Sequence, residues 1–170
     1  MDSKIVKLSE DAILPTYATN GSAGFDLYAL EDVLVKPQET VFVKTGLSME
    51  IPEDMAVMIY PRSGVSAKTT LRLANGVGVI DSDYRGEVKL IMFNSAAPSK
   101  HQVPQYTLTD GQAVDDYSLG YNPSGTCLIK KGDRIAQGVL QDITQADFKI
   151  VKEHSENTTR GKDDFGSSGK

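Results

Sequence analysis

The segment NGVGVIDSDYRGEV, residues 75–88, places a charged run between two runs of strand-forming residues. Its middle holds five polar residues: Asp81, Ser82, Asp83, Tyr84 and Arg85. Short β-branched runs predict strands, and polar residues between them predict a turn. Taken alone, the two carboxylates favour a solvated turn, and the alternative is that one of them orients a water molecule.

Short strand-forming runs continue in both directions from this segment. They lie at residues 5–8, 33–36, 40–44, 56–60, 86–93, 126–129, 134–140 and 148–151. Turn signals such as Asn20-Gly21 separate them. Many short strands between regular turns predict an all-β barrel or jelly roll. The sequence predicts one brief helix, near residues 64–69, with Ser63 as a possible N-cap.

The composition is that of an acidic globular domain. The chain has 170 residues, a hydrophobic content of 39% and a net charge of −5. Without a cluster of Lys and Arg, nucleic-acid binding is not expected. No run of 18 apolar residues predicts a membrane span, and no signal peptide is expected. Cys127 is the only cysteine, which favours a buried core residue and a cytoplasmic location.

Two segments depart from the strand pattern. Residues 95–123 are polar and rich in turns, and so long a loop between strands is usually functional or disordered. We interpret these residues as an insert in a β-barrel domain of residues 1–153. Residues 154–170 are too polar and too rich in Gly and Ser to form core, so they form either a disordered end or a flexible arm.

Several polar side chains stand where a strand meets a turn. Asp26 interrupts an apolar strand, so its carboxylate either faces water or pairs with another side chain. Gln137 also interrupts an apolar run and needs a hydrogen-bond partner. Arg62 and Ser63, at the start of the predicted helix, suit either an anion site or an ordinary capped turn.

The segment at residues 75–88 offers the groups that a nucleoside needs. The amide of Asn75 both donates and accepts hydrogen bonds, which suits the edge of a pyrimidine. Tyr84 has a flat face that can pack on a sugar and exclude an extra hydroxyl. Either Asp81 or Asp83 can orient a water molecule. No Cys/His zinc spacing and no Ser/His/Asp order is evident, so a general base must be a carboxylate.

The arm carries groups that suit a phosphate chain and a flat ring. Arg160 has a planar fork for phosphate oxygens, and Gly166 allows backbone N–H groups to approach them closely. Ser167 and Ser168 add hydroxyl donors, and Phe165 is an aromatic ring between small residues. Alone, this signal is weak, because tails of this composition are common.

Five segments together resemble the ordered motifs of the homotrimeric dUTPases, the deoxyuridine 5'-triphosphate nucleotidohydrolases. They are AGFDLYA, PRSGVSAK, GVIDSDYRGEV, GDRIAQ and RGKDDFGSSG. The resemblance extends from about residue 21 to residue 169. It implies a jelly-roll-like β fold, a homotrimer with active sites at subunit interfaces, and hydrolysis of dUTP to dUMP and pyrophosphate. Such an enzyme controls the dUTP level and supplies dUMP for dTTP synthesis.

The resemblance also implies a role for each motif residue. Asp81 is similar to the residue that activates the attacking water, Asn75 to the uracil reader and Tyr84 to the platform that excludes ribose. Asp26 corresponds to an acid that contacts Mg²⁺ through water, while the triphosphate binds the ion directly. The remaining substrate-binding positions are Arg62, Ser63, Gly64, Gln137, Arg160, Phe165, Gly166, Ser167 and Ser168.

Two departures from the family pattern stand out. Asp163 and Asp164 occupy positions where the fifth motif usually has more glycine, so they add negative charge beside the triphosphate. The insert is similar to the extra segment of some bacteriophage dUTPases, which implies a host-cell cytoplasm. Certain members of that group also bind a repressor of mobile genetic elements. The alternative to an enzyme alone is therefore an additional anti-repressor role, with the insert tyrosines either as interface anchors or packed on the barrel.

Overall fold

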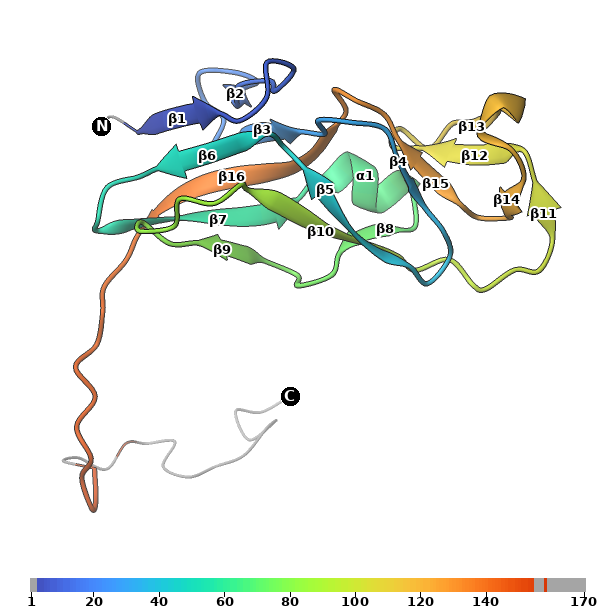
Figure 1. The fold of residues 1–170 in the computed structure, drawn as a ribbon. Helices are drawn as coiled ribbons and strands as arrows, with labels where there is room; N and C mark the ends of the chain where they lie inside the picture. Colours follow the sequence, from blue (N-terminus) through green and yellow to red (C-terminus); the bar gives the residue numbers. More distant parts are fainter. Residues whose placement is uncertain (1–2, 155–157, 159–170) are drawn as a thin grey trace.

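Five antiparallel strands form the largest sheet of the computed structural model, which describes residues 3–154 and residue 158 (Figure 1). In spatial order they are β2 (Thr16–Tyr17), β3 (Phe25–Tyr28), β16 (Arg134–Asp142), β7 (Met55–Pro61) and β9 (Gly78–Ile80). β16 lies in the centre, where it pairs with β3 on one side and β7 on the other.

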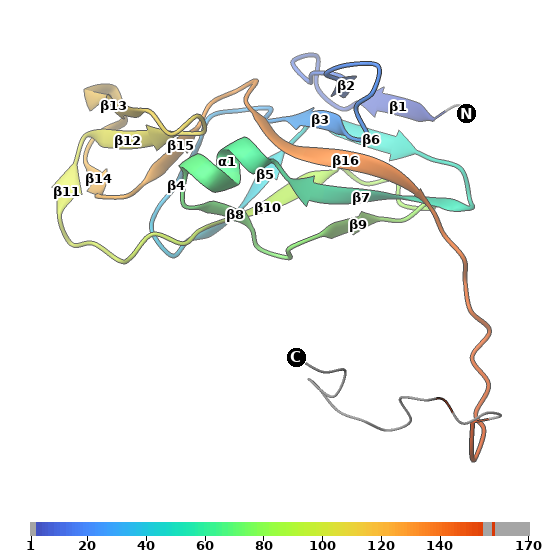
Figure 2. The same cartoon turned by 180° about the vertical axis from the view of Figure 1, so that it is seen from behind.

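Four smaller sheets complete the fold, and the reverse view shows β11 to β14 gathered at one end of the molecule (Figure 2). A three-stranded sheet contains β5 (Thr40–Lys44), β10 (Lys89–Asn94) and β8 (Leu71–Leu73). A four-stranded sheet contains β13 (Ala113–Asp115), β12 (Gln105–Leu108), β15 (Cys127–Ile129) and β4 (Val33–Val35). Two pairs complete the fold: β1 (Lys4–Lys7) with β6 (Leu47–Glu50), and β11 (Gln102–Val103) with β14 (Asn122–Pro123).

The core lies between these sheets and is formed by their inward-facing apolar side chains. Leu27 and Ile59 of the large sheet belong to the same buried cluster as Val43 and Leu90 of the opposite one. Alternate residues of a strand face opposite sides, so each sheet contributes one apolar face. Cys127 is buried in this cluster, as its apolar run predicted. The predicted all-β, jelly-roll-like fold is confirmed.

The short helix is confirmed, but its predicted cap is wrong. Helix α1 spans Ser63–Lys68 and connects β7 to β8. Its N-cap is Arg62, with extended backbone and no side-chain hydrogen bond, while Ser63 is the first helical residue. Because the Ser63 side chain does not cap the helix, its hydroxyl remains available for another partner.

One predicted strand is absent. Residues 148–151 have no strand structure, and Phe148 is 92% exposed. A strand needs a neighbour for its backbone hydrogen bonds, and after β16 the described chain leaves the barrel (Figure 1). Its strand-forming composition therefore has no partner within the described residues of this chain.

Residues 95–123, which we interpret as an insert, form ordered structure rather than an open loop. They include β11 to β14 and the 3-10 helix η1 (Tyr117–Leu119). Tyr106 is fully buried, and its hydroxyl donates to the carbonyl of Gly120 at 2.7 Å. Tyr106 therefore packs within this segment, where Asn122 Nδ2 also donates to its hydroxyl at 3.0 Å, and is not exposed as an interface anchor. Tyr117 and Tyr121 are 70% and 64% exposed and form an edge-to-face pair.

Within the described ranges, no helix has the length and apolar character needed to cross a membrane.

Candidate functional site

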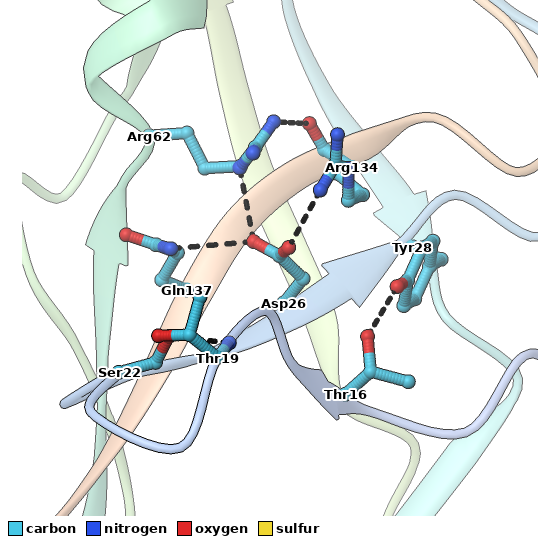
Figure 3. A network of polar contacts seen from close by, with 8 residues as sticks. All are labelled: Thr16, Thr19, Ser22, Asp26, Tyr28, Arg62, Arg134 and Gln137. Carbon is cyan, nitrogen blue, oxygen red and sulfur yellow. Dashed lines mark hydrogen bonds and ion pairs between the residues drawn. The ribbon is translucent and has the colours of Figure 1, made fainter.

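Four polar side chains converge where β3, β7 and β16 lie side by side (Figure 3). Asp26 is at their centre, and its side chain is only 2% exposed. The Asp26 Oδ1 atom lies 3.0 Å from Nε of Arg62 and accepts a hydrogen bond from Nε2 of Gln137 at 3.3 Å. The Oδ2 atom lies 3.3 Å from Nη1 of Arg134. These residues, Asp26, Arg62, Arg134 and Gln137, form the guanidinium cluster.

Strand register brings three of these side chains to one face of the sheet. Gln137 pairs with Asp26 on β3 and with Tyr60 on β7, so the three side chains point the same way. Arg62 stands two residues after Tyr60 and therefore continues that face.

A register shift in β16 brings the fourth side chain to the same face. Arg134 is three residues before Gln137 and would point to the opposite face of a regular strand. The shift between Arg134 and Ala136 adds the residue that restores the common face. Nothing in the sequence signals this bulge, and Arg134 is a cluster member that the sequence did not predict.

Asp26 neutralises part of a strongly cationic site. Burying a carboxylate is costly unless it is paired and hydrogen-bonded, and here both oxygens have partners. The side chains of Arg62 and Arg134 are 25% and 50% exposed, so each guanidinium has further N–H groups that face outward. Arg62 Nη1 also donates to the carbonyl of Arg134 at 3.1 Å, which fixes its orientation. The outward donors suit the oxygens of a phosphate chain.

The start of α1 lies beside this cluster. Ser63 and Gly64 are both exposed, and Gly64 lines the same surface hollow as Arg62. A Cβ at Gly64 would meet no atom within 4 Å, so the backbone is open to a ligand. The backbone of the second motif at Gly64 therefore lies next to the two arginines.

The second group of predicted residues flanks β9 and forms what we call the β9 group: Asn75, Asp81 and Tyr84. Asn75 lines one hollow with Gly78, and a Cβ at Gly78 would lie 3.3 Å from the Asn75 amide nitrogen. Gly78 therefore leaves the room that the amide occupies.

Asp81 and Tyr84 line an adjacent hollow, which shares Val79, Ile80, Lys89 and Ile91 with the hollow that Asn75 lines. The volume of this adjacent hollow is about 260 Å³, and the exposed apolar residues Phe42 and Val79 also line it. The Tyr84 hydroxyl donates to the carbonyl of Glu87 at 3.1 Å, and the ring lies where a Cβ at Gly86 would collide with it. Gly86 is thus required by the position of the Tyr84 ring, a dependence that the sequence did not indicate.

The polar run of residues 81–85 is an ordered, exposed turn. Tyr84 N donates to the carbonyl of Asp81 at 3.2 Å, and Arg85 Nη1 donates to the carbonyl of Ser82 at 2.6 Å. The carboxylates of Asp81 and Asp83 lie on exposed residues, so neither is sequestered by the core.

The guanidinium cluster and Asp81 lie at opposite ends of the β7–β9 pair. Val57 of β7 pairs with Ile80 of β9, so Asp81 lies beyond Val57, towards the start of β7. Arg62 follows the other end of β7. By this register Asp81 lies level with Ala56, which is six residues before Arg62. At about 3.3 Å per residue, the distance along the strands is about 20 Å. One chain therefore brings together the first, second and fourth motifs but not Asp81 of the third.

The described side chains do not form a metal site by themselves. Within residues 3–154 and residue 158, no three His, Cys, Asp or Glu side chains lie close enough to hold an ion. Both Asp26 oxygens already face cationic or amide groups. These residues fit an ion that is held mainly by phosphate oxygens and reaches Asp26 through water.

The arm residues of the fifth motif, Arg160, Phe165, Gly166, Ser167 and Ser168, lie outside the described residues. So does most of the proposed arm at residues 154–170.

Comparison with known proteins gives one consistent result. The dUTPase family model matches residues 10–102 and 119–169. The chain is 39% identical, over the whole of both chains, to the deoxyuridine 5'-triphosphate nucleotidohydrolase of Nautilia profundicola.

Solved phage enzymes share the fold at the level of the whole chain. The dUTPase of Staphylococcus bacteriophage 80alpha with dUPNHPP superposes with a TM-score of 0.92 at 32% identity, over 99% of this chain and 98% of that one. That protein is described as controlling transfer of virulence genes by a G protein-like mechanism. A mutant dUTPase from phage phi11 of S. aureus, with a structural Mg(II) ion, has a TM-score of 0.86 at 30% identity, over 92% of this chain and 100% of that one.

Proposed function

The chain belongs to the dUTPase family and is a dUTP diphosphatase, and we propose that each dUTP molecule binds between the guanidinium cluster of one subunit and the β9 group of its neighbour. The cluster would hold the triphosphate, and the β9 group would hold the uracil and deoxyribose and supply the base. The convergence of Arg62, Arg134 and Gln137 on Asp26 is the observation that carries this proposal. It provides outward-facing donors for phosphate at a single point of the barrel surface.

The proposed chemistry is attack of water on the α-phosphorus. Asp81 orients the water and accepts its proton, while the new P–O bond forms and the α–β anhydride bond breaks, releasing pyrophosphate. Arg62, Ser63, Gly64 and Gln137 hold the phosphate oxygens as negative charge moves to the leaving group. The exposure of Asp81 supports this role, because its carboxylate is open to water and to a ligand.

The proposed base and sugar selection uses the other two members of the β9 group. The Asn75 amide, with room left by Gly78, would read the edge of uracil. The Tyr84 ring, held by the Glu87 carbonyl, would lie against the deoxyribose and leave no space for a 2'-hydroxyl.

Mg²⁺ is the proposed cofactor. When bound, it would neutralise triphosphate charge and fix the conformation of the phosphate chain. The phi11 enzyme was solved with a structural Mg(II) ion, which supports binding of this ion in the family. Here Asp26 would act through water, since its own oxygens are engaged by the cluster.

A homotrimer with sites between subunits is the proposed assembly. The reacting water lies about 3 Å from the phosphorus, so one chain's Asp81 and guanidinium cluster, about 20 Å apart along the β7–β9 pair, would not act on the same phosphate. The apolar residues beside Asp81, Phe42 and Val79, are exposed in the single chain and suit an interface. We propose further that residues 1–153 form the barrel domain, that residues 154–170 form an arm which closes each site, and that the enzyme is cytoplasmic.

In the proposed arm, Arg160, Ser167 and Ser168 would bind the γ-phosphate. Phe165 would stack on uracil, and Gly166 would allow the backbone to approach the phosphates.

Pyrophosphate release from four nucleotides tests the function directly. We expect rapid release from dUTP, with kcat/KM for UTP, dTTP and dCTP lower by at least about 100-fold. UTP differs from dUTP in the sugar that contacts Tyr84, and dTTP and dCTP differ in the base that contacts Asn75. Chelation of Mg²⁺ should lower the dUTP rate, and added Mg²⁺ should restore it. Comparable rates with UTP and dUTP would contradict the role of Tyr84.

A regulatory function is the second candidate, and two observations favour it. The 80alpha dUTPase is described as controlling transfer of virulence genes, and residues 103–118 are the part of this chain that falls between the two ranges matched by the family model. The exposed Tyr117–Tyr121 pair lies at the edge of this segment and suits an interface with a repressor of mobile genetic elements.

Replacing both tyrosines with alanine should weaken capture of such a repressor by at least about tenfold without changing dUTP turnover. Calorimetry with the purified repressor checks the affinity. Unchanged affinity would exclude this surface.

A further inference from the structure

The insert contacts the phosphate end of the site through one tight turn. β12 and β13 are joined by residues 109–112, of which we call residues 109–111 the inserted turn, and Leu108 N donates to the carbonyl of Gln112 at 2.8 Å across it. The inserted turn forms one wall of a surface hollow of about 400 Å³. Arg62, Lys68 and Arg134 also line this hollow, so it is an extension of the guanidinium cluster.

Thr109 makes the first contact of the inserted turn with the barrel. Its Oγ1 donates to Asp133 Oδ2 at 2.8 Å, and Lys130 N donates to the same oxygen at 2.9 Å. This carboxylate therefore closes the turn at residues 130–133 and ties it to the insert. Arg134 follows directly: its side chain contacts Asp26, and its carbonyl accepts from Arg62.

Gly111 makes the second contact. Its φ is +87°, and a Cβ built there would lie 2.9 Å from both Cβ and the carbonyl oxygen of Lys68 at the end of α1. Only glycine combines this backbone conformation with so close an approach. The inserted turn thus fits against α1 on one side and against the turn before Arg134 on the other.

We propose that Thr109 and Gly111 are positioning residues of the phosphate site: they hold Asp133 and α1 so that Arg134, Arg62 and Lys68 face the hollow together. This inference rests on the proposed function, because it assigns the terminal phosphates of dUTP, and the pyrophosphate product, to this hollow. Asp110 and Asp133 also line the hollow, so the placement of the three cations relative to these acids decides whether an anion binds.

Inhibition by the two products, pyrophosphate and dUMP, distinguishes a positioning role of Thr109 from a role only in the stability of the fold. Thr109→Val keeps the shape of the side chain but removes its hydroxyl. We expect about a tenfold weaker inhibition by inorganic pyrophosphate and a similar rise in KM for dUTP, since a charge-assisted hydrogen bond is lost. Inhibition by dUMP should change less than about twofold, because base and sugar bind at the β9 group. Thr109→Ser keeps the hydroxyl and should restore pyrophosphate inhibition.

A pair of glycine variants provides a matched control. Gly120 lies in the same insert with a φ of +76°, but a Cβ there meets no atom within 4 Å. Gly111→Ala and Gly120→Ala therefore both place a side chain at a positive φ, and only Gly111→Ala displaces Lys68. We expect weaker pyrophosphate inhibition in Gly111→Ala alone.

The outcomes are distinct. Equal inhibition by pyrophosphate in Thr109→Val and the unaltered chain, or equal effects of the two glycine variants, would overturn the inference. If Thr109→Val does not fold, the glycine pair decides. Absence of dUTP hydrolysis in the unaltered chain would instead overturn the proposed function.

Discussion

Asp81→Asn is expected to lower kcat for dUTP by about 1,000-fold, within the range that general bases contribute. Asparagine has nearly the same shape as aspartate but is unable to accept the proton of the attacking water. Asp81 lies on an exposed turn and makes no side-chain bond that supports the fold among the described contacts. Binding of the non-hydrolysed analogue dUpNHpp should therefore change less than about threefold. Pyrophosphate release and calorimetry measure the two quantities.

Asp83→Asn is the matched control for this prediction. Asp83 is an exposed carboxylate in the same turn, two residues further along the chain. It experiences a similar solvent environment, so its replacement should leave kcat within about threefold, as is usual for exposed positions. Full activity of Asp81→Asn, or an equal loss in both variants, would remove Asp81 from the role of base. Circular dichroism of both proteins verifies that the barrel is folded.

The fold was predictable because its signal is local. Short alternating or β-branched apolar runs identified β5, β7, β10 and β16, because such runs are typical of strands that pack on a core. The same local signal failed at residues 148–151, where strand-forming composition is present but no neighbouring strand exists within the described chain. Strand formation depends on a partner as well as on propensity.

The site was predictable only in part. Asp26 and Gln137 each required a polar partner because each interrupts an apolar run, and they are partners of each other. Arg134 was missed because its orientation depends on a register shift in β16, and no residue type in this strand predicts that shift. Thr109 was missed for a different reason: its contact with Asp133 joins residues that are 24 positions apart. Contacts between residues this far apart depend on how the strands are connected in the fold. Local patterns of residue type along the sequence do not predict them.

A mixture of two inactive variants is expected to regain activity if each site is shared between subunits. Arg62→Gln weakens the guanidinium cluster, and Asp81→Asn removes the proposed base, so each variant alone should be nearly inactive. In a cyclic trimer in which one subunit supplies the β9 group and the next supplies the cluster, every mixed trimer contains one site with both groups intact. Purified mixed trimers should therefore have about one third of the original kcat per trimer.

Two different affinity tags on the co-expressed variants allow the mixed trimers to be isolated. Light scattering should give three times the 18.4 kDa mass of the chain. The control is a mixed trimer in which both tagged chains carry Asp81→Asn, which should remain inactive. Mixed trimers of the correct mass without recovered activity would mean that Asp81 and the cluster act within one chain. That result would require the roughly 20 Å between them along the β7–β9 pair to close by a rearrangement of the largest sheet. Because the register of β7 with β9 and β16 is fixed by continuous pairing, sharing between subunits is the arrangement that the barrel favours.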